Sequence, residues 1–544
     1  MLFSHLDQYI EAGVASRNAQ RGRWHLVAYE AEGFDGVMLG CGELTDPDPI
    51  TVHLGLTGPH RIFLGLYAYG NGAIRVRLSD HPYSTRFATP PRSVILPPVI
   101  HEVEWKACDL TGRDLIIEGA FQRKALPGAL AFIRAVPLAR MPAVVPRPDV
   151  WRPMCISNDG CGVFRDSHHR RPEEILETTA AIPDSSCMRS LLWGNGNADS
   201  CNYPTQVGNP MFLDRWADPH CACDGNFGLP NLARWQDEGW DSLKLVRDYT
   251  RSRDWELHVY IRMQAFAGCY PHEELVWSEF FRAHPEWWCR DRAGHPLNRL
   301  SYAYAEVRRH LLDLITEIAA YQPDGVCLCM VRGVPLVLYE PIVVNDFQKI
   351  HGVDPRSLTS TDERWLEYQA GIITAFIREV RAVLAPEQKL SIMVPGNEGD
   401  CRSWGFDVKT WAAEGIVDDL YPVGQTFNEA NVHECNPRSL DFPFFQGLPR
   451  RHRMRLIPTF YTWTLRHQDP TAFRALIRSS LEDGADSYCI WDGHDPYSHE
   501  LYGDIGFRDW QGPAPVTAAA SGKQHALHVL NAFRVDEYGG GEVV

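Results

Sequence analysis

The sequence predicts an α/β protein in which a β-sandwich of jelly-roll type precedes a (β/α)8 TIM barrel. Two observations lead to this fold class. The first region carries short apolar segments separated by turn residues, and the second alternates apolar runs with amphipathic helices. A chain of 544 residues also exceeds what one core normally holds. The expected parts are the sandwich at residues 1–141, a linker at 142–153 and the barrel with a C-terminal extension at 154–544.

Strand signals without helical periodicity fill the N-terminal region. Residues 57–59 (Thr-Gly-Pro) and 69–72 (Tyr-Gly-Asn-Gly) are good turn sequences between the segments. Many short strands at regular spacing indicate a sandwich or a jelly roll. Four prolines within residues 142–153 then mark the linker. The expected strands are 24–29, 50–56, 60–68, 73–78, 93–99, 114–118 and 129–137.

The alternation of strand and helix is clearest between residues 300 and 331. Residues 307–320 carry apolar side chains at helical spacing, a Pro-Asp-Gly turn follows, and residues 326–331 form an apolar run that suits a strand buried on both faces. Eight such strands over about 340 residues match the size of a (β/α)8 barrel. Residues 526–538 are expected to form a final strand or a docking segment. The expected barrel strands are 188–193, 255–263, 300–302, 326–331, 389–394, 419–423, 455–461 and 487–491.

Composition narrows the class of partner and the compartment. The net charge of −16 argues against nucleic acid and against a membrane surface, and no apolar run reaches the length of a membrane span. The start of the chain is not expected to be a secretory signal. The 15 cysteines are scattered without a CxxC pair, which favours free thiols in the cytoplasm. The 17 Trp and 20 Tyr suit stacking on sugar rings or, equally, large cores and an oligomer interface.

The barrel fold directs the search for a site to the ends of the strands, where the following loops begin. Glycosidic bond cleavage needs two carboxyl groups, one to protonate the leaving oxygen and one to act as nucleophile or base. Glu398 in VPGNEGD is expected to be the acid, Asp492 in IWDGHD the base or nucleophile, and Glu340 in LYEP a third candidate. Glu398 could instead be a solvated loop carboxylate, and Asp492 could cap the next loop. Aspartates that precede strands are expected to be turn and capping residues, namely Asp324, Asp418, Asp419 and Asp486.

Sugar-binding candidates follow the same strands. Arg332 in MVRG could bind an acidic group of the substrate, hold a catalytic carboxylate ionised, or form a structural ion pair. No metal site and no cofactor is expected, because no glycine-rich phosphate loop follows a strand and the His and Asp residues at 494–499 have a spacing common by chance. The other expected sugar contacts are Gln264, Tyr302, Tyr461, Trp463 and Trp491.

Three motifs are similar to one known group of barrels. HPEWW (284–288), AYAEVRRHLLDLITEIAAYQPDGVCL (303–328) and GFDVKTWAAEGIVDDLYP (405–422) resemble the glycosyl-hydrolase-like barrels related to the family 10 glycosidases. The resemblance covers residues 185–510 and implies the barrel fold, since these motifs belong to the scaffold. Relatives often carry Asp where this chain has Cys329, and strand seven lacks the glutamate nucleophile of family 10 enzymes. The resemblance therefore implies a carboxylate pair placed elsewhere.

These patterns predict a glycoside hydrolase that acts on an oligosaccharide or a polysaccharide. Two other functions remain open: a carbohydrate-binding barrel without catalysis, and a lyase or isomerase of an acidic sugar that uses Arg332 with a Tyr or His base. The expected partner is a carbohydrate, with no nucleic acid and no membrane. A homo-oligomer is compatible with the aromatic content.

Overall fold

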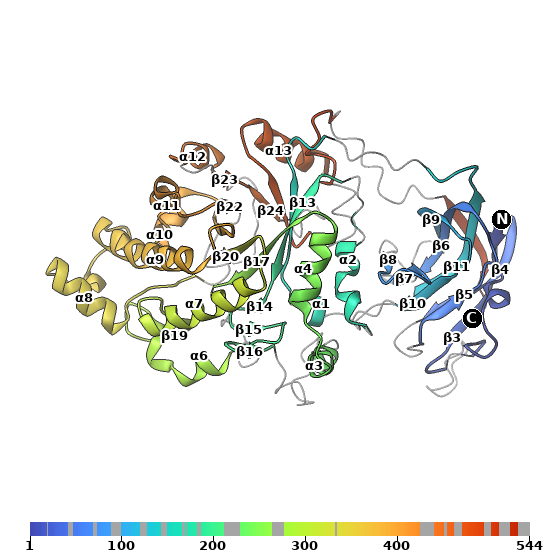
Figure 1. Ribbon diagram of the computed structural model, residues 1–544, viewed down its shortest axis with the longest axis horizontal. Helices are drawn as coiled ribbons and strands as arrows, with labels where there is room; N and C mark the ends of the chain where they lie inside the picture. Colours follow the sequence, from blue (N-terminus) through green and yellow to red (C-terminus); the bar gives the residue numbers. More distant parts are fainter. Residues whose placement is uncertain are drawn as a thin grey trace. The chain divides into compact units, whose positions relative to one another are not determined.

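The computed structural model describes residues 1–18, 20–41, 47–68, 73–88, 99–119, 128–142, 149–160, 162–165, 169, 171–180, 182, 186–211, 229–263, 277–331, 334–424, 440–450, 454–461, 470–493, 502–510 and 523–530. The chain folds as two compact units (Figure 1). The barrel unit holds residues 147–165 and 185–514, and the antiparallel unit holds residues 1–146, 166–184 and 515–544. The chain therefore enters the antiparallel unit three times, whereas the expected division had a single crossing at the linker.

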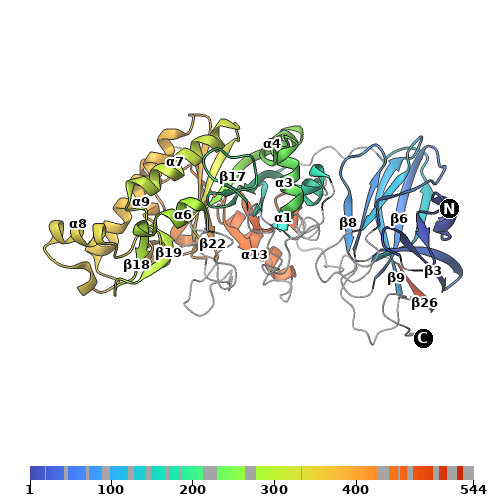
Figure 2. The ribbon, with the colours of Figure 1, turned by 90° about the horizontal axis from the view of Figure 1, so that it is seen from below.

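A closed parallel sheet surrounded by helices forms the centre of the barrel unit, as the sequence predicts (Figures 1 and 2). The sheet closes because β12 pairs with both β13 and β25, and β21 pairs with β22. β23 and β24 together make the seventh strand. The strands are β12 (Met154–Asn158), β13 (Met188–Gly194), β17 (Glu256–Arg262), β20 (Gly325–Cys329), β21 (Lys389–Pro395), β22 (Asp419–Val423), β23 (Arg455–Leu456), β24 (Thr459–Tyr461) and β25 (Tyr488–Trp491).

The helices of the barrel unit bury one apolar face each. α9 begins after Asp362, whose side chain accepts a hydrogen bond from the backbone N–H of Arg364, and it buries Ile373, Ile377 and Val380. α7 and α9 lie side by side outside the strands (Figures 1 and 2). The helices are α1 (Gly162–Arg165), α3 (Leu229–Asp237), α4 (Ser242–Ser252), α6 (Glu279–Ala283), α7 (Ala305–Ala320), α8 (Pro341–His351), α9 (Glu363–Val383), α10 (Glu398–Ser403), α11 (Val408–Glu414), α12 (Phe442–Gln446) and α13 (Pro470–Glu482).

Two of the sequence-based strand assignments are wrong in detail. The first barrel strand is β12, which the sequence reasoning left unassigned, so the segment expected as strand one is the second strand, and that expected as strand two is the third. The segment expected as strand three lies outside the barrel, because β19 (Pro296–Leu300) pairs antiparallel with β18 (Trp288–Arg290). Only Leu300 of β19 is buried, whereas a barrel strand buries side chains on both faces. The other barrel strands lie where they were expected, within a few residues.

Carboxylates at the starts of the strands have a structural role, as the sequence predicts. At three places around the barrel an aspartate that precedes one strand accepts a hydrogen bond from a backbone N–H at the start of another. This satisfies a donor that the sheet ladder leaves open. The acceptors are Asp324 for Leu257 at 2.8 Å, Asp418 for Leu390 at 2.8 Å and Asp486 for Leu456 at 2.9 Å.

The antiparallel unit contains two sheets that share an apolar core. In the first sheet β11 pairs with both β4 and β6, so this sheet closes on itself. The expected segment 93–99 lies outside the described residues except for Val99, which begins β9. The strands are β1 (Leu2–Phe3), β2 (Ala15–Ser16), β3 (Trp24–Ala31), β4 (Phe34–Cys41), β5 (Ile50–Val52), β6 (Pro59–Ala68), β7 (Ala73–Leu78), β8 (Thr85–Ala88), β9 (Val99–Asp109), β10 (Leu115–Gly119), β11 (Gly128–Pro137) and β26 (Gln524–Leu530).

Two later segments of the chain complete this unit. β26 pairs with β3 and β9, so the strand expected near residue 526 is present and belongs to the first sheet. The crossover between β12 and β13 contributes a 3-10 turn and α2 (Glu177–Ala180), and buried Arg75 of β7 lies 3.0 Å from Glu174 and 3.2 Å from Glu177. These carboxylates compensate the buried guanidinium charge. Within the described residues no helix combines the length and the apolar character needed to cross a membrane.

Candidate functional site

Polar side chains gather where three consecutive barrel strands end. Arg262 ends β17, and its Nη2 lies 3.1 Å from Oδ2 of Asp159, which follows β12. Its Nη1 donates to Oδ1 of Asn197, in the short strand β14 (Gly196–Asn197) after β13, at 3.2 Å. Arg262 is 11% exposed and Asp159 is 20% exposed, so the pair is partly open to solvent. We call Asp159, Asn197 and Arg262 the rim cluster.

Asp492 and Asp159 follow two strands that lie next to each other in the barrel. Asp492 directly follows β25, which pairs with β12, and its backbone N–H donates to Oγ of Ser157 at 3.0 Å. Its φ of 48° places a non-glycine residue in the left-handed region, where backbone strain often accompanies function. The side chain is partly exposed, although its Oδ1 is covered by protein. The structure thus brings the sequence-predicted Asp492 beside the rim cluster.

Trp491 lies just inside the mouth of the barrel. Its indole is buried among the apolar residues that fill the barrel, and it meets the ring of Tyr260 edge to face with centroids 6.2 Å apart. The aromatic side chain expected to contact a sugar therefore forms the floor beneath the neighbouring Asp492. Cys329 at the end of β20 belongs to the same buried group, and no carboxylate stands at that position.

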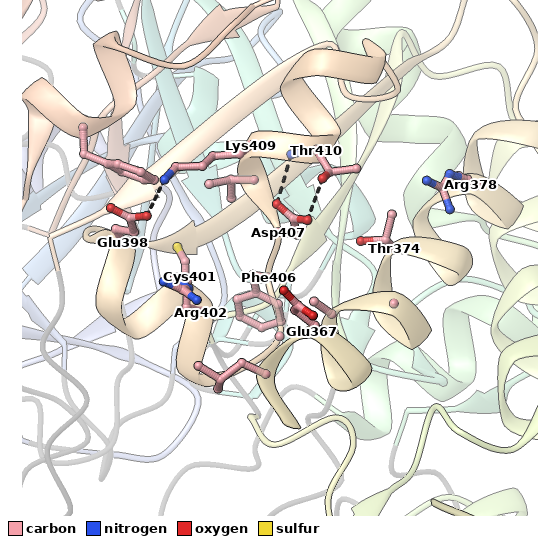
Figure 3. A pocket seen from close by; sticks show the side chains of 16 residues that line it. Glu367, Thr374, Arg378, Glu398, Cys401, Arg402, Phe406, Asp407, Lys409 and Thr410 are labelled. Atoms are coloured by element: carbon pink, nitrogen blue, oxygen red, sulfur yellow. Dashed lines mark hydrogen bonds and ion pairs between the residues drawn. The ribbon is translucent and has the colours of Figure 1, made fainter. Parts of the chain in front are cut away.

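Glu398 lies outside the barrel, in a groove between helices (Figure 3). It is the first residue of α10, and its carboxylate is paired with Nζ of Lys409 at 2.5 Å. The groove has a volume of about 390 Å³ and is lined by α9, α10, α11 and Phe444. Neither Asp492 nor Glu340 lines it. The structure therefore does not bring Glu398 and Asp492 together as the predicted acid and base. Glu398 begins a helix, and its side chain points toward Lys409.

Glu340 is fully buried, and its carboxylate accepts hydrogen bonds from backbone N–H groups. Its Oε1 accepts hydrogen bonds from the backbone N–H groups of Arg290 at 3.3 Å and Leu338 at 3.1 Å, and Oε2 accepts from Leu338 at 3.0 Å. Burial raises the pKa of this carboxyl. The side chain fastens the β18–β19 hairpin to the start of α8, so the geometry gives it a structural role in place of the expected catalytic one.

The expected sugar contact Tyr302 is also enclosed. It has no exposed surface, its hydroxyl donates to the carbonyl oxygen of Met263 at 2.6 Å, and its ring packs against Phe376. A side chain in this position cannot reach a sugar without rearrangement. The other expected contacts Gln264, Arg332 and Trp463 lie outside the described residues, as does the side chain of Tyr461, whose backbone ends β24.

Sequence reasoning missed Asp159 because it missed the strand before it. The signal was the short run Met154–Ile156 followed by Asn158, Asp159 and Gly160, a strand with a turn directly after the proline-rich linker. Arg262 was visible as the end of a predicted strand, but its partner was not. Among the described residues, no group of three or more His, Cys, Asp or Glu side chains is arranged to hold a metal ion.

Comparison with known proteins gives similarity at the level of solved structures alone. No protein-family model matches the sequence. No curated protein matches it either. The PgaB (BpsB) glycoside hydrolase domain from Bordetella bronchiseptica is 12% identical with a TM-score of 0.43, and the match covers 66% of this chain and 100% of that one. A GH18 chitinase from Pseudoalteromonas aurantia is 11% identical with a TM-score of 0.34, over 64% of this chain and 97% of the chitinase.

A third similar structure is TtGalA, an α-galactosidase from Thermus thermophilus. It is 12% identical with a TM-score of 0.34, over 87% of this chain and 91% of the galactosidase. All three are glycoside hydrolases, and none of the three is described as a family 10 enzyme. At these scores the matches indicate no substrate and no catalytic residues for this chain.

Proposed function

We propose that the barrel unit is a glycoside hydrolase that acts on an oligosaccharide or a polysaccharide, with Asp159 and Asp492 as its carboxylate pair. The observation that carries this proposal is the placement of two partly exposed carboxylates after neighbouring strands, β12 and β25, at the loop end of the barrel. Active sites of this fold lie at that end. Two carboxyl groups are also what glycoside hydrolysis requires.

The surroundings suggest a different role for each carboxylate. Arg262 supplies a positive charge 3.1 Å from Asp159, which favours the charged form that a base or a nucleophile needs. Asp492, which directly follows β25, is the other carboxylate of the pair and is assigned the role of general acid. In the proposed reaction Asp492 gives its proton to the glycosidic oxygen as the bond between this oxygen and the anomeric carbon breaks. A water molecule loses a proton to Asp159 and its oxygen bonds to the anomeric carbon.

A carbohydrate-binding barrel without catalysis is the second candidate. One observation favours it: β20 ends at Cys329 and β24 consists of Thr459, Phe460 and Tyr461, so these two strands offer no carboxylate. Such a protein would bind sugars in the mouth of the barrel and release them unchanged. The rim cluster would then supply hydrogen bonds instead of proton transfer.

The cysteines support a reducing compartment as the proposed location. The ten free cysteines within the described part of the chain are all buried. Unpaired buried thiols are typical of proteins kept in reducing surroundings. The proposal of a cytoplasmic protein rests on this usage alone.

The test compares three conservative variants on a panel of α- and β-linked oligosaccharides, with release of reducing ends as the signal. Asp159→Asn and Asp492→Asn each keep the side-chain shape and are expected to lower kcat by about 10²–10⁴-fold. Glu398→Gln, in the outer groove, is the matched control and is expected to keep full activity. If Glu398→Gln alone lost activity, the catalytic site would lie in the outer groove and not at the rim cluster. Sugar binding without any cleavage by the parent protein would favour the second candidate.

A further inference from the structure

Four aromatic rings pack against one another on α6, on the turn that follows it and on α7. The ring of Phe280 on α6 lies face to face with the ring of His310 on α7, with centroids 3.7 Å apart and planes at 10°. The ring of His284 lies face to face with that of Trp287 at 3.7 Å and 17°. Phe280 joins the two pairs, at 5.2 Å from His284 and 5.5 Å from Trp287. We call these four residues the aromatic platform.

Carboxylates hold both imidazole rings of the platform in place. Nε2 of His310 lies 3.0 Å from Oδ2 of Asp199, which has no exposed surface. Nδ1 of His284 lies 2.9 Å from Oε1 of Glu286, which is 58% exposed. The outer end of the platform is thus both aromatic and polar, since His284 is 32% exposed and its partner Glu286 is an exposed carboxylate.

Three further aromatic rings pack together on residues next to the platform in the sequence. The rings of Phe281 and Trp288 stack at 4.6 Å and 17°, and the indole N–H of Trp288 donates to the carbonyl oxygen of Phe281 at 3.0 Å. Trp277 packs against both of these rings. Because rings that are already fixed lose little freedom when a ligand arrives, such a surface is well suited to binding.

The platform lies on the same end of the barrel as the rim cluster. Its helices and the β18–β19 hairpin all come between the end of β17 and the body of α7, and loops that follow strands lie at the mouth. Figures 1 and 2 both draw α6 close to α7. The short hairpin after β13 links the two features, because Asn197 in β14 bonds Arg262 and Asp199 in the following turn bonds His310.

We infer that the aromatic platform is an accessory sugar-binding subsite, which accepts the apolar face of a pyranose ring of a longer substrate. This inference rests on the proposed function of the rim cluster. Flat rings with polar groups at their edge are the surface on which a sugar ring can stack while its hydroxyls find partners. Glu286 would accept a hydrogen bond from a sugar hydroxyl. A sugar bound here lies beyond the cleavage point, so short substrates do not reach it.

Binding to sugars of different length tests the inference. The probes are disaccharides and hexasaccharides of the same panel, and affinity is measured calorimetrically in the full chain carrying Asp492→Asn, so that bound sugar is not consumed. Trp287→Ala is expected to weaken hexasaccharide binding about tenfold and to leave disaccharide binding unchanged. His284→Ala is a second variant in case the tryptophan replacement does not fold. Trp404→Ala, a half-buried tryptophan at the end of α10, is the control and is expected to bind as the parent does.

The outcomes separate the two proposals. Equal hexasaccharide affinity in Trp287→Ala, His284→Ala and the parent would overturn the subsite and leave hydrolysis standing. Platform-dependent binding in a parent protein that cleaves nothing would support the subsite and overturn hydrolysis. A chain that binds no sugar of any length would overturn both.

Discussion

The guanidinium of Arg262 lies 3.1 Å from the carboxylate of Asp159, although 103 positions separate the two residues in the chain. The same guanidinium donates to Asn197 at 3.2 Å, so one side chain spans the ends of β12, β13 and β17. We expect Arg262 to position Asp159 for the proposed reaction. Arginine suits this task because its planar fork can hold two oxygen acceptors at once.

Replacement of Arg262 should therefore reduce catalysis more than stability. Arg262→Met removes both hydrogen bonds and the charge, and we expect kcat to fall by about 10²-fold or more. Arg262→Lys keeps the charge and should recover part of kcat, with little change in KM in either variant. Thermal unfolding checks that the fold is intact. Equal kcat in the two variants, or a loss that follows unfolding, would show that the arginine is merely structural.

The direction in which Asp159 points predicts the stereochemistry of the reaction. Its carboxylate reaches past β13 to Arg262 on β17, whereas Asp492 stands on the opposite side, after β25. Neighbouring strands are about 4.8 Å apart, so the two carboxyl groups are expected to be separated by more than one strand spacing. A separation of about 6.5–9.5 Å leaves room for a water molecule and inverts the anomeric centre.

We therefore expect inversion of configuration. Proton NMR of the first product formed distinguishes the anomers before they equilibrate. A product with retained configuration would mean that the carboxylates are about 5 Å apart and that one of them is a nucleophile. Asp159→Asn with added azide provides the control. If this variant of an enzyme that retains configuration is rescued by azide, the product is a glycosyl azide of inverted configuration, because azide takes the place of the missing nucleophile.

The barrel could be predicted from the sequence because periodicity reports burial. Residues 326–331 are apolar without alternation, which few environments other than the strand of a helix-covered parallel sheet allow. β12 could not be predicted because it is only five residues long, Met154–Asn158. It directly follows a proline-rich linker, and no helix precedes it to mark the alternation of helix and strand. Residues 300–302 suggest a barrel strand because Leu300 and Tyr302 are apolar, and only the strand pairing shows that Leu300 ends the hairpin strand β19, whose partner is β18.

The site was harder to predict because it depends on how the barrel closes. Asp159 and Asp492 become neighbours when the last strand pairs with the first, a contact that no local pattern reports. Glu398 does follow its strand as expected, but it begins α10 and turns toward Lys409. Whether a loop carboxylate faces the mouth or a neighbouring helix depends on the conformation of a few residues, which hydrophobic periodicity does not encode.

Aspartates at the opposite end of the barrel should affect stability alone. Asp418 accepts a hydrogen bond from the backbone N–H of Leu390 at 2.8 Å and lies 3.1 Å from Arg381. Asp418→Ala leaves the backbone donor without its partner, and we expect a loss of about 1–3 kcal/mol in unfolding free energy. The value of kcat should not change at temperatures where the variant is folded. A loss of kcat without a loss of stability would contradict the structural role of these residues.

Glu340 should make the anchorage of the β18–β19 hairpin depend on pH. Burial raises the pKa of this carboxyl, and in the unfolded chain a glutamate titrates near about 4.3. The folded protein favours the protonated carboxyl of Glu340. The contribution of this group to stability is therefore full below about pH 4.3 and is lost as the pH rises through the pKa of the folded state. Glu340→Gln cannot ionise, so the stability of the hairpin should lose this dependence.

Hydrogen exchange at the backbone amides of Arg290 and Leu338 measures this effect locally, since both donate to Glu340. In the parent protein their protection, after correction for intrinsic exchange, is expected to fall as the pH rises from about 4.3. In Glu340→Gln one acceptor oxygen is lost, so protection should be lower at acid pH but independent of pH. Glu398→Gln, which replaces an exposed carboxylate, is the control for changes in net charge. An identical pH profile in the parent and in Glu340→Gln would show that another group governs the hairpin.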